Sequence, residues 1–422
     1  MSCTIYGSPW RRRLLEDVRE RLFTPASGRP GASRYGAEVE LLALDAGSGR
    51  PVTIFGDPRE AGSLAFLQAH GEPRGWRLEP GPHGVPAVRL PDGGRITWEP
   101  GGQIEYATPP RDTVAALSAD LDRVVPPLIA AAADAGIRLV GQGIDPLNPL
   151  ERARPVLAGE RYTAMRRYLA RIGEAGPRMM LQTAAIQVNI ELADAEGRDA
   201  DLRYRVLHAA APYLTAAFAN SGTYAGEDTG YASFRARQWR LLDRRRTGVL
   251  GREPDIAAEY TDFGLEAGWM FGPEEREPEP FAEWVVRGEV TVEDWRKHLT
   301  TLFPEIRPRG FLEVRCIDAL PADWCAVPAS LVAGLVADPR SLTEAAEVVG
   351  APDSVLLQDA ARLGVRDPRL GRGAAALFEI ALRAAERTGV VEGRALEVAR
   401  AFFEGYTARG RAPGDEGVGA AA

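Results

Sequence analysis

The chain has 422 residues, of which 45% are hydrophobic and 26% charged, and its formal net charge is −8. This composition is typical of a globular protein with a sizeable core, and no basic cluster stands among aromatic residues, so we expect no nucleic-acid partner. The N-terminal segment is too charged at 11–13 for a secretory signal, and three cysteines do not make a disulfide framework. We therefore expect a cytoplasmic protein.

Two further features exclude whole classes of protein. The most apolar window, residues 124–137, is broken by two prolines and Asp134 and therefore cannot span a bilayer. Lys297 is the only lysine in the chain. The sequence thus has no P-loop for nucleotide phosphates, and Schiff-base chemistry would depend on that single residue.

The periodicity of apolar residues predicts alternating helices and strands over the first 143 residues. They are a helix over 9–23, a strand over 34–44, a short strand over 51–55, a short helix over 62–70, a hairpin of residues 87–90 with a strand beginning at 95, a helix over 112–135 and a strand over 137–143.

The rest of the chain is richer in helix. The pattern predicts a helix ending near 173, a strand over 179–191, a helix over 200–219, arginine-rich loops and short elements over 220–250, a helix over 292–303, a strand over 310–317 and helices from 328 to 407. The Glu- and Pro-rich segment 252–290 is expected to be a surface excursion. Residues 408–422 lack bulky apolar side chains and are expected to be a disordered tail.

Residues 95–109 combine a strand-like pattern with two carboxylates. Glu99 and Glu105 lie on either side of a Pro-Gly-Gly break at 100–102. A pair of glycines inside a strand marks a bulge or a place where a ligand comes close to the backbone. We therefore expect one bent strand lined with acid, paired to residues 87–90 through a tight turn.

Four predicted strands place polar side chains on one face, two residues apart where the strand is regular. These are Glu38 and Glu40, Glu99 and Glu105, Gln187 and Asn189, and Glu313 and Arg315. Whether Glu99 and Glu105 lie on the same face of the strand depends on the bulge between them. The neighbours of the other pairs are apolar, so one face of each strand packs on a core. The alternative is that the polar face is simply the solvated side of an amphipathic sheet.

Glu38 and Glu40 favour a bound cation over a solvated face. Their row continues with Leu42 and Leu44, so the segment is apolar on both sides. Carboxylates placed there are costly unless something cationic binds between them. Oxygen ligands without cysteine or clustered histidine indicate Mg²⁺ or Mn²⁺ rather than zinc, and magnesium sites with few protein ligands commonly hold nucleotide phosphates.

Arginines supply the complementary charge. Arg235, Arg237, Arg246 and Arg315 are candidates for bidentate contacts with carboxylate or phosphate groups, the alternative for each being a surface or salt-bridge residue. The four histidines are scattered without metal-ligand spacing, and no Gly-x-Ser-x-Gly elbow or Cys/His pair stands out.

These segments, taken in order, resemble the plant-type glutamate–cysteine ligases, a family with bacterial members that make γ-glutamylcysteine for ergothioneine. The matching segments are Gly-Ala-Glu-Val-Glu at 36–40, Glu-Pro-Gly-Gly-Gln-Ile-Glu at 99–105, Arg-Met-Met-Leu at 178–181, Gln-Val-Asn at 187–189, Phe-Arg at 234–235 through Arg-Thr-Gly at 246–248, residues 298–305, and Leu-Glu-Val-Arg at 312–315. The resemblance runs from about residue 34 to 340.

The resemblance implies an α+β fold with a glutamine synthetase-like catalytic core, in which a curved, mostly antiparallel sheet forms a funnel with helices outside. We expect one catalytic domain over 1–407, with the core at 34–340 and a C-terminal helical part at 341–407 that carries no motif of the family. By position, the implied metal ligands are Glu38, Glu40, Glu99, Glu105 and Glu313. The implied nucleotide- and substrate-binding residues are Gln187, Asn189, Arg235, Arg237 and Arg246, and the implied catalytic residues are Arg315, Glu313 and Arg235.

The implied reaction joins the γ-carboxylate of glutamate to the amino group of L-cysteine. It uses ATP as co-substrate with Mg²⁺ or Mn²⁺, passes through γ-glutamyl phosphate, and gives γ-glutamylcysteine, ADP and phosphate for glutathione- or ergothioneine-type thiol biosynthesis. The alternatives are a sibling carboxylate–amine ligase with a different acceptor amine and a non-enzymatic module that binds nucleotide or divalent cation. A glycoside hydrolase would use two carboxylates and leave the amides and arginines without a role.

Overall fold

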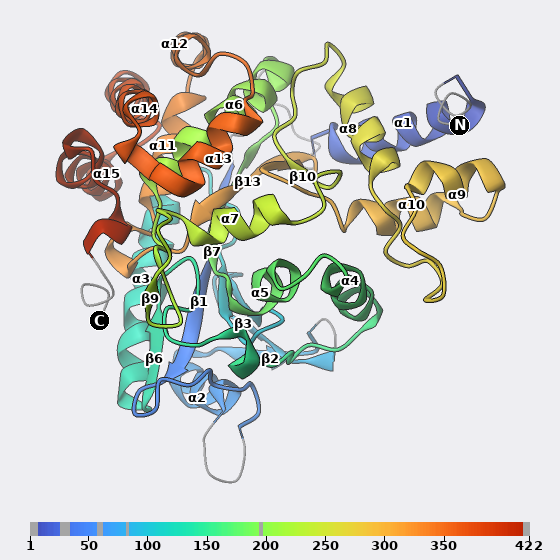
Figure 1. The fold of residues 1–422 in the computed structure, drawn as a ribbon. Coiled ribbons are helices and arrows are strands. Elements are labelled where there is room, and N and C mark those ends of the chain that lie inside the picture. The colour runs from blue at the N-terminus through green and yellow to red at the C-terminus, as the bar shows by residue number, and fades with distance from the viewer. Residues whose placement is uncertain (1–6, 26–33, 57–61, 82–83, 194–196, 417–422) are drawn as a thin grey trace.

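The computed structural model describes residues 7–25, 34–56, 62–81, 84–193 and 197–416. Within them one open, nine-stranded sheet has the order β12-β13-β7-β1-β5-β4-β3-β2, with β6 pairing to β1 off this path (Figure 1). All of its strand pairs are antiparallel, in agreement with the mostly antiparallel sheet that the resemblance implied. The strands are β1 (Tyr35–Asp45), β2 (Arg77–Glu79), β3 (Ala87–Arg89), β4 (Arg95–Trp98), β5 (Ile104–Ala107), β6 (Ile137–Val140), β7 (Ala185–Glu191), β12 (Ile306–Pro308) and β13 (Phe311–Asp318).

Helices cover the apolar face of this sheet. Val39, Val188 and Val314 are fully buried there because alternate residues of a strand point to the same side. The helices that contact these strands are α3 (Val114–Asp134), α6 (Ala200–Ala217) and α11 (Val327–Leu335). Around α6 and α11 pack α12 (Pro339–Val349), α13 (Ser354–Leu363), α14 (Pro368–Thr388) and α15 (Gly393–Gly405). None of the helices in the described ranges is both long and apolar enough to cross a membrane.

The opposite, polar face of the sheet is covered by shorter elements. These are α4 (Glu160–Ala170), α5 (Ala175–Gln182) and α7 (Phe234–Leu241), which contribute side chains to a cavity shared with the strands. The remaining elements are α2 (Ser63–Gly71), the antiparallel pair β8 (Thr223–Tyr224) and β9 (Glu227–Asp228), and the parallel pair β10 (Thr247–Gly248) and β11 (Phe303–Pro304).

A second hydrophobic core forms a lobe to the right in Figure 1. Its helices are α1 (Pro9–Leu22), α8 (Ile256–Glu266), α9 (Phe281–Arg287) and α10 (Val292–Leu299). Leu14, Phe281 and Trp295 are almost completely buried in it. The prediction that residues 252–290 form a surface excursion was therefore wrong. Prolines and acidic residues separate two short helices there; α8 packs against the N-terminal helix α1, and Phe281 of α9 packs beside Trp295 of α10.

The Pro-Gly-Gly break is a turn and not a bulge. β4 and β5 are two antiparallel strands, with Trp98 paired to Ile104, so the chain reverses between them. Gly102 has a φ of +92°, which favours glycine, and a Cβ at Gly101 would lie 1.9 Å from the carbonyl oxygen of Leu181. The two glycines thus serve a tight turn and a close approach of the protein's own backbone.

Four other local predictions need correction. The strand predicted over 179–191 is divided, because α5 continues to residue 182 before β7 begins. The predicted strand 51–55 makes a single bridge, and the helix predicted over 292–303 ends at Leu299. Residues 408–416 are not disordered: they form two 3-10 turns, and the Gly414 amide donates to the Ala219 carbonyl at 3.0 Å. The rest of the predicted tail, 417–422, lies outside the described residues.

Candidate active site

Strand register brings most of the predicted polar residues together on one face of the sheet. The directly opposed pairs are Glu40 with Glu105, Glu38 with Gln187, and Glu313 with Asn189. Opposed residues of an antiparallel pair have Cβ atoms about 4.5–5.5 Å apart, so their side chains interact. Like charges in such positions repel one another. The sheet therefore concentrates acid where an ordinary solvated face would disperse it.

Three carboxylates converge at the centre of this face. Oxygen atoms of Glu40, Glu99 and Glu105 all lie within 4.8 Å of one another. Glu40 is held in place from β7: its Oε2 accepts from the Ala185 amide at 2.8 Å, and its Oε1 accepts from Gln187 Nε2 at 3.0 Å. The Pro-Gly-Gly turn between β4 and β5 brings Glu99 beside Glu40 and Glu105.

Burial raises the pKa values of all three carboxyl groups, and repulsion from neighbouring carboxylates adds to this effect for Glu40 and Glu105. Burial first, and then the charge of Glu99, raises the pKa of Glu40 to about 8. Burial followed by the charges of Glu38, Glu99 and Glu40 raises the pKa of Glu105 well above its ordinary value. Converging buried carboxylates are costly without a counter-charge. A hard divalent cation with oxygen ligands offsets that cost, so this donor set fits Mg²⁺ or Mn²⁺.

Glu313 belongs to a different group of charges. It is fully buried; its Oε1 accepts from Arg307 Nη2 and Arg309 Nη1, both at 3.0 Å, and its Oε2 accepts from Arg315 Nη1 at 2.7 Å. Burial alone would raise the pKa of Glu313, but the three guanidinium groups outweigh it and hold the pKa well below its usual value. Both oxygens are thus engaged by arginines, which favours a role in holding these arginines over the predicted metal-binding role.

Arg315 and Arg235 connect this charge network to the carboxylates. Arg315 Nη1 also donates to Gln187 Oε1 at 2.6 Å, and Gln187 in turn holds Glu40. Arg235 Nη2 donates to the Arg315 carbonyl at 2.9 Å, and its Nη1 lies 3.7 Å from Asp318 Oδ1. The side chains of both arginines are therefore fixed at the edge of the carboxylate cluster.

A cavity of about 330 Å³ unites these groups. The predicted residues that line it are Glu38, Glu40, Glu99, Glu105, Gln187, Arg235 and Arg315. Asn189 does not line the cavity but contacts a residue that does: its Nδ2 donates to Glu38 Oε1 at 3.2 Å. Lining residues that the sequence analysis did not select include Arg161, Tyr162, Met165, Met179, Met180, Trp239, Arg307 and Arg309.

Only some of these additional residues had a usable signal in the sequence. Arg307 and Arg309 lie two apart, the same spacing that identified the carboxylates, and register places Arg307 opposite Glu313. Applying the strand rule to them would have found both. Arg161 and the methionines lie on α4 and α5, and no pattern of helical residues indicates which turn faces a sheet cavity.

A second cavity, of about 660 Å³, adjoins the first. The two share Arg161, Arg307 and Arg309, and Arg21 and Arg296 also line the second. Among the described residues its lining contains no acidic side chain. Several guanidinium groups around one cavity give it a positive potential, which favours an anionic ligand.

Two arginines predicted from the sequence lie elsewhere. The Arg237 guanidinium lies over the ring of Tyr231, 5.0 Å from its centroid, and not in the cavity. Arg246 is fully buried under the lobe, where Nη1 donates to the Thr301 carbonyl at 2.9 Å and Nη2 donates to the Gly268 carbonyl. Its donors are used by the protein itself, so the geometry favours a structural role.

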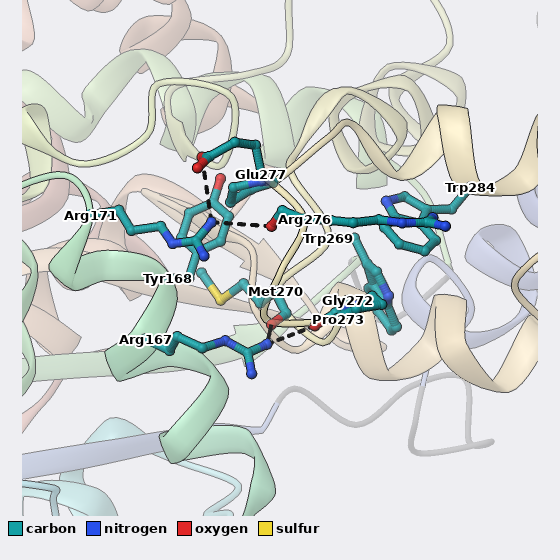
Figure 2. A pocket seen from close by; sticks show the side chains of 11 residues that line it. Arg167, Tyr168, Arg171, Trp269, Met270, Gly272, Pro273, Arg276, Glu277 and Trp284 are labelled. Atoms are coloured by element: carbon teal, nitrogen blue, oxygen red, sulfur yellow. Dashed lines mark hydrogen bonds and ion pairs between the residues drawn. The ribbon is translucent and has the colours of Figure 1, made fainter.

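A small pocket between α4 and the connection from α8 to α9 joins the lobe to the cavity wall (Figure 2). Arg167 Nη2 donates to the carbonyl groups of Met270 and Gly272, and Arg171 Nη2 donates to that of Glu274. The pocket holds about 10 Å³, roughly the room of one water molecule. It is a packed contact and has no space for a substrate.

Comparison with known proteins agrees with this geometry. The model of glutamate-cysteine ligase family 2 matches residues 34–411. The glutamate–cysteine ligase EgtA of Mycolicibacterium smegmatis is 39% identical over 312 residues, which cover 69% of this chain and 71% of that protein. The chloroplastic glutamate–cysteine ligase B of Oryza sativa subsp. japonica is 33% identical over 265 residues, covering 58% of this chain and 52% of that one.

Structural comparison shows the same fold. A crystal structure of the glutamate–cysteine ligase of Francisella tularensis in complex with AMP superposes with a TM-score of 0.53 at 12% identity, covering 92% of this chain and 84% of that one. The predicted α+β fold and the predicted resemblance are both confirmed. The chain is a ligase and belongs to glutamate-cysteine ligase family 2.

Proposed function

We propose that this enzyme uses ATP to join the γ-carboxylate of L-glutamate to the amino group of L-cysteine, giving γ-glutamylcysteine for thiol biosynthesis of the glutathione or ergothioneine type. The observation that carries the proposal is the single cavity in which strand register gathers carboxylates beside arginines. Such a site suits phosphoryl transfer, in which catalysis is mostly positioning and charge neutralisation.

Glu40, Glu99 and Glu105 are the residues that would hold Mg²⁺ or Mn²⁺, with Glu38 beside them. When bound, the cation supplies neutralisation of phosphate oxygens. Gln187 and Asn189 hold Glu40 and Glu38 in place through their amide groups. These amides keep the carboxylate oxygens turned toward the cavity.

The arginines provide the positive wall of the site. Arg315, fixed between Glu313 and Gln187, faces the transferred phosphoryl group. Arg235 holds a substrate carboxylate at the cavity edge. The rest of the phosphate chain extends toward the second cavity, which the shared Arg161, Arg307 and Arg309 connect to the first.

The reaction has two balanced steps. A γ-carboxylate oxygen of glutamate attacks the terminal phosphorus of ATP, a new P–O bond forms, and the P–O bond to ADP breaks. The amine of the acceptor then attacks the acyl carbon, the C–N bond forms, and phosphate leaves with the electron pair of the C–O bond while one N–H proton passes to solvent. The residues of the cavity orient both substrates and keep water from the acyl phosphate.

Hydroxylamine tests this mechanism because it replaces the acceptor amine without a side chain. Glutamate, MgATP and hydroxylamine should give γ-glutamyl hydroxamate together with ADP and phosphate. Glu105→Gln should abolish the product, whereas Glu397→Gln, at an exposed position on α15, should leave it unchanged. Release of AMP and pyrophosphate would contradict the proposal. Hydroxamate from other acids but not from glutamate would identify a sibling ligase.

A further inference from the structure

Asp318, at the end of β13, is a buried carboxylate that lies outside the sheet cavity. The residue is 1% exposed and does not line the cavity. Its Oδ2 accepts from the Ser221 hydroxyl at 2.6 Å and from the Asn220 amide at 2.9 Å, and its Oδ1 accepts from the Ser233 hydroxyl at 2.9 Å. Gly143 leaves room for the carboxylate, since a Cβ there would lie 2.5 Å from Asp318 Cγ. Asp318 is thus tied to both ends of segment 220–233, which leads into α7.

The two hydroxyls that donate to Asp318 also hold the first turn of α7. Ser233 is the N-cap of this helix, and its Oγ accepts from the Ala236 amide at 3.0 Å. Ser221 Oγ accepts from the Arg235 amide at 3.1 Å. A hydroxyl has one hydrogen, so donation to Asp318 leaves the oxygen lone pairs for the helix amides. Asp318 therefore orients both hydroxyls toward the backbone that carries Arg235.

The guanidinium of Arg235 is balanced in charge but keeps donors free. Arg235 is 4% exposed and lines the sheet cavity. Its Nη2 donates to the Arg315 carbonyl at 2.9 Å, whereas its Nη1 lies 3.7 Å from Asp318 Oδ1, which is too far for a hydrogen bond. Its Nε has no partner among the described residues. The Asp318 oxygens are used by other donors, so N–H groups of Arg235 remain for a carboxylate ligand.

A role in folding alone would not need a charge at Asp318. Hydrogen bonds from two hydroxyls and an amide do not require an ionised acceptor, and burial of a carboxylate is costly. Across the part of the chain that the structure describes, the ion pair of Asp318 is with Arg235. The charge therefore favours a role that acts through Arg235.

We propose that Asp318 is a positioning residue for Arg235. It fixes the first turn of α7 through Ser221 and Ser233, and it balances the guanidinium charge without taking the N–H groups that hold a substrate carboxylate. This inference rests on the proposed function, because Arg235 needs an amino-acid substrate to hold.

The first test is Asp318→Asn, which keeps the size of the side chain but removes its charge. The KM of one of the two amino-acid substrates should rise by about 10- to 100-fold, because a displacement of about 1 Å at a positioning group can cost that much. The KM for ATP, which has no carboxylate, should change by less than about threefold. An unchanged KM for both amino acids would overturn the inference.

Asp145→Asn is the matched control. Asp145 is 3% exposed and accepts from the Leu147 and Asn148 amides at 2.9 and 3.0 Å, but it does not line the cavity. Its replacement should lower the midpoint of thermal unfolding and leave all KM values within about twofold of the wild type. If Asp145→Asn raised the same KM as Asp318→Asn, the effect would be one of general stability, and the positioning role would fail.

A double-mutant cycle shows whether Asp318 acts through Arg235. In an Arg235→Gln background, Asp318→Asn should reduce kcat/KM for the same amino acid by less than about threefold, because the group that it positions is gone. The thermal midpoint should still fall in that background. Losses in kcat/KM that add in the double variant would overturn the inference.

Ser233→Ala keeps the test decisive if Asp318→Asn does not fold. It leaves the charge of Asp318 in place and removes one hydroxyl between this carboxylate and α7. The KM of the same amino acid should rise by about 3- to 10-fold. Thr113→Ala removes a comparable N-cap from α3, where the hydroxyl accepts from the Ala116 amide at 3.1 Å, and should leave every KM unchanged. Equal KM values in the two variants would contradict the positioning role.

The outcomes separate this inference from the function on which it rests. Wild-type enzyme that makes γ-glutamyl hydroxamate, together with an additive cycle, would overturn the positioning role alone. Wild-type enzyme that makes no hydroxamate from glutamate would overturn both.

Discussion

Two buried polar regions of this molecule differ in how their charges are balanced. In the sheet cavity, Glu40, Glu99 and Glu105 bring oxygens of like charge within 4.8 Å of one another. Under the lobe, Arg246 is fully buried, and its donors meet carbonyl groups and the Asp243 carboxylate. We propose that a bound cation completes the first region, whereas the second is complete within the chain.

This difference distinguishes a ligand-binding site from a buried charged group that only stabilises the fold. A buried charge whose partners are all present stabilises one arrangement of the backbone and leaves nothing for a ligand. Buried like charges destabilise the protein by themselves and are retained where a ligand offsets their repulsion. Burial of a charge alone therefore does not identify a functional site. Such a site is indicated by buried charges whose repulsion no partner within the protein offsets.

The largest expected effect on turnover comes from replacing one of the three carboxylates in the sheet cavity. Glu105→Gln removes a charge from the cluster, so turnover should fall by about 1,000-fold or more because cation binding is lost. The metal-free variant should be more stable than the metal-free wild type, since repulsion is relieved. ADP release and thermal unfolding with and without MgCl₂ measure both effects.

The exposed Glu397→Gln variant serves as the control for both measurements. It should keep the activity of the wild type and the stabilisation by magnesium. Near-normal turnover of Glu105→Gln at limiting magnesium would remove Glu105 from the ligands.

Replacement of Arg246 under the lobe should instead reduce stability and leave substrate binding unchanged. Arg246→Leu leaves the Thr301 and Gly268 carbonyls and the Asp243 carboxylate without their donor, so the free energy of unfolding should fall by about 3–5 kcal/mol. The KM values of the remaining folded enzyme should change by less than about twofold, because the side chain does not line the cavity. Urea unfolding and steady-state kinetics distinguish these effects.

Arg237→Leu is the comparison, since Arg237 is only partly buried and pairs with rings; it should cost less than about 1 kcal/mol. If Arg246→Leu were stable and raised the KM of a substrate, the sequence-based prediction of a binding arginine would be restored.

The strand rule explains which parts of the site could be predicted from the sequence. A period of two residues fixes the face of a side chain, so Glu38, Glu40, Gln187 and Arg315 were found from neighbours along the chain. The mostly antiparallel sheet, in contrast, was implied by the resemblance to the ligase family and not by this alternation. Register between strands distant in sequence, such as Glu313 opposite Asn189, follows from the whole fold and could only be inferred through the resemblance.

Other parts could not be read from local patterns. A Pro-Gly-Gly segment is compatible with a bulge and with a turn, and only the antiparallel pairing of Trp98 with Ile104 distinguishes them. Arg246 looks like a ligand-binding arginine because its partners, 22 and 55 residues away, are backbone carbonyls, which every residue has. The core of the lobe joins α1 to α8, helices more than 200 residues apart, and so leaves no local signal.

A smaller effect should follow from replacing the arginine at the edge of the incomplete region. Arg315→Lys keeps the positive charge but loses the planar guanidinium, whose Nη1 contacts both Gln187 and Glu313 and whose other N–H groups remain for a ligand. We expect kcat to fall by about 10- to 100-fold while the KM for ATP changes by less than about threefold. Arg309→Lys, at a half-exposed side chain, should reduce kcat less. A raised KM with normal kcat would make Arg315 a ground-state binding residue.

The smallest effect is a difference in pH dependence between the two regions. Glu40 has a pKa of about 8 in the folded protein against an ordinary 4.5, so between these values the metal-free folded protein keeps a proton that the unfolded chain has released. Stability should therefore fall as pH rises through this window. Burial lowers the pKa of His298, in the lobe beside Arg246, from 6.5 to about 3. There the unfolded chain binds a proton that the folded protein does not, so stability should fall as pH drops from 6.5.

The two slopes can be separated by variants, because each titrating group contributes at most about 1.4 kcal/mol per pH unit. Urea midpoints of the metal-free protein, measured from pH 3 to 8, should give a plateau between about pH 4.5 and 6.5, where the two contributions cancel, with an acidic limb below it and a basic limb above it. His298→Gln should flatten the acidic limb only, and Glu40→Gln should flatten the basic limb only. Saturating magnesium should also flatten the basic limb, because the cation replaces the proton at the carboxylates, and it should leave the acidic limb of the lobe unchanged. A basic limb that persists in magnesium would mean that the carboxylate cluster does not bind the ion, and the contrast between an incomplete and a complete region would fail.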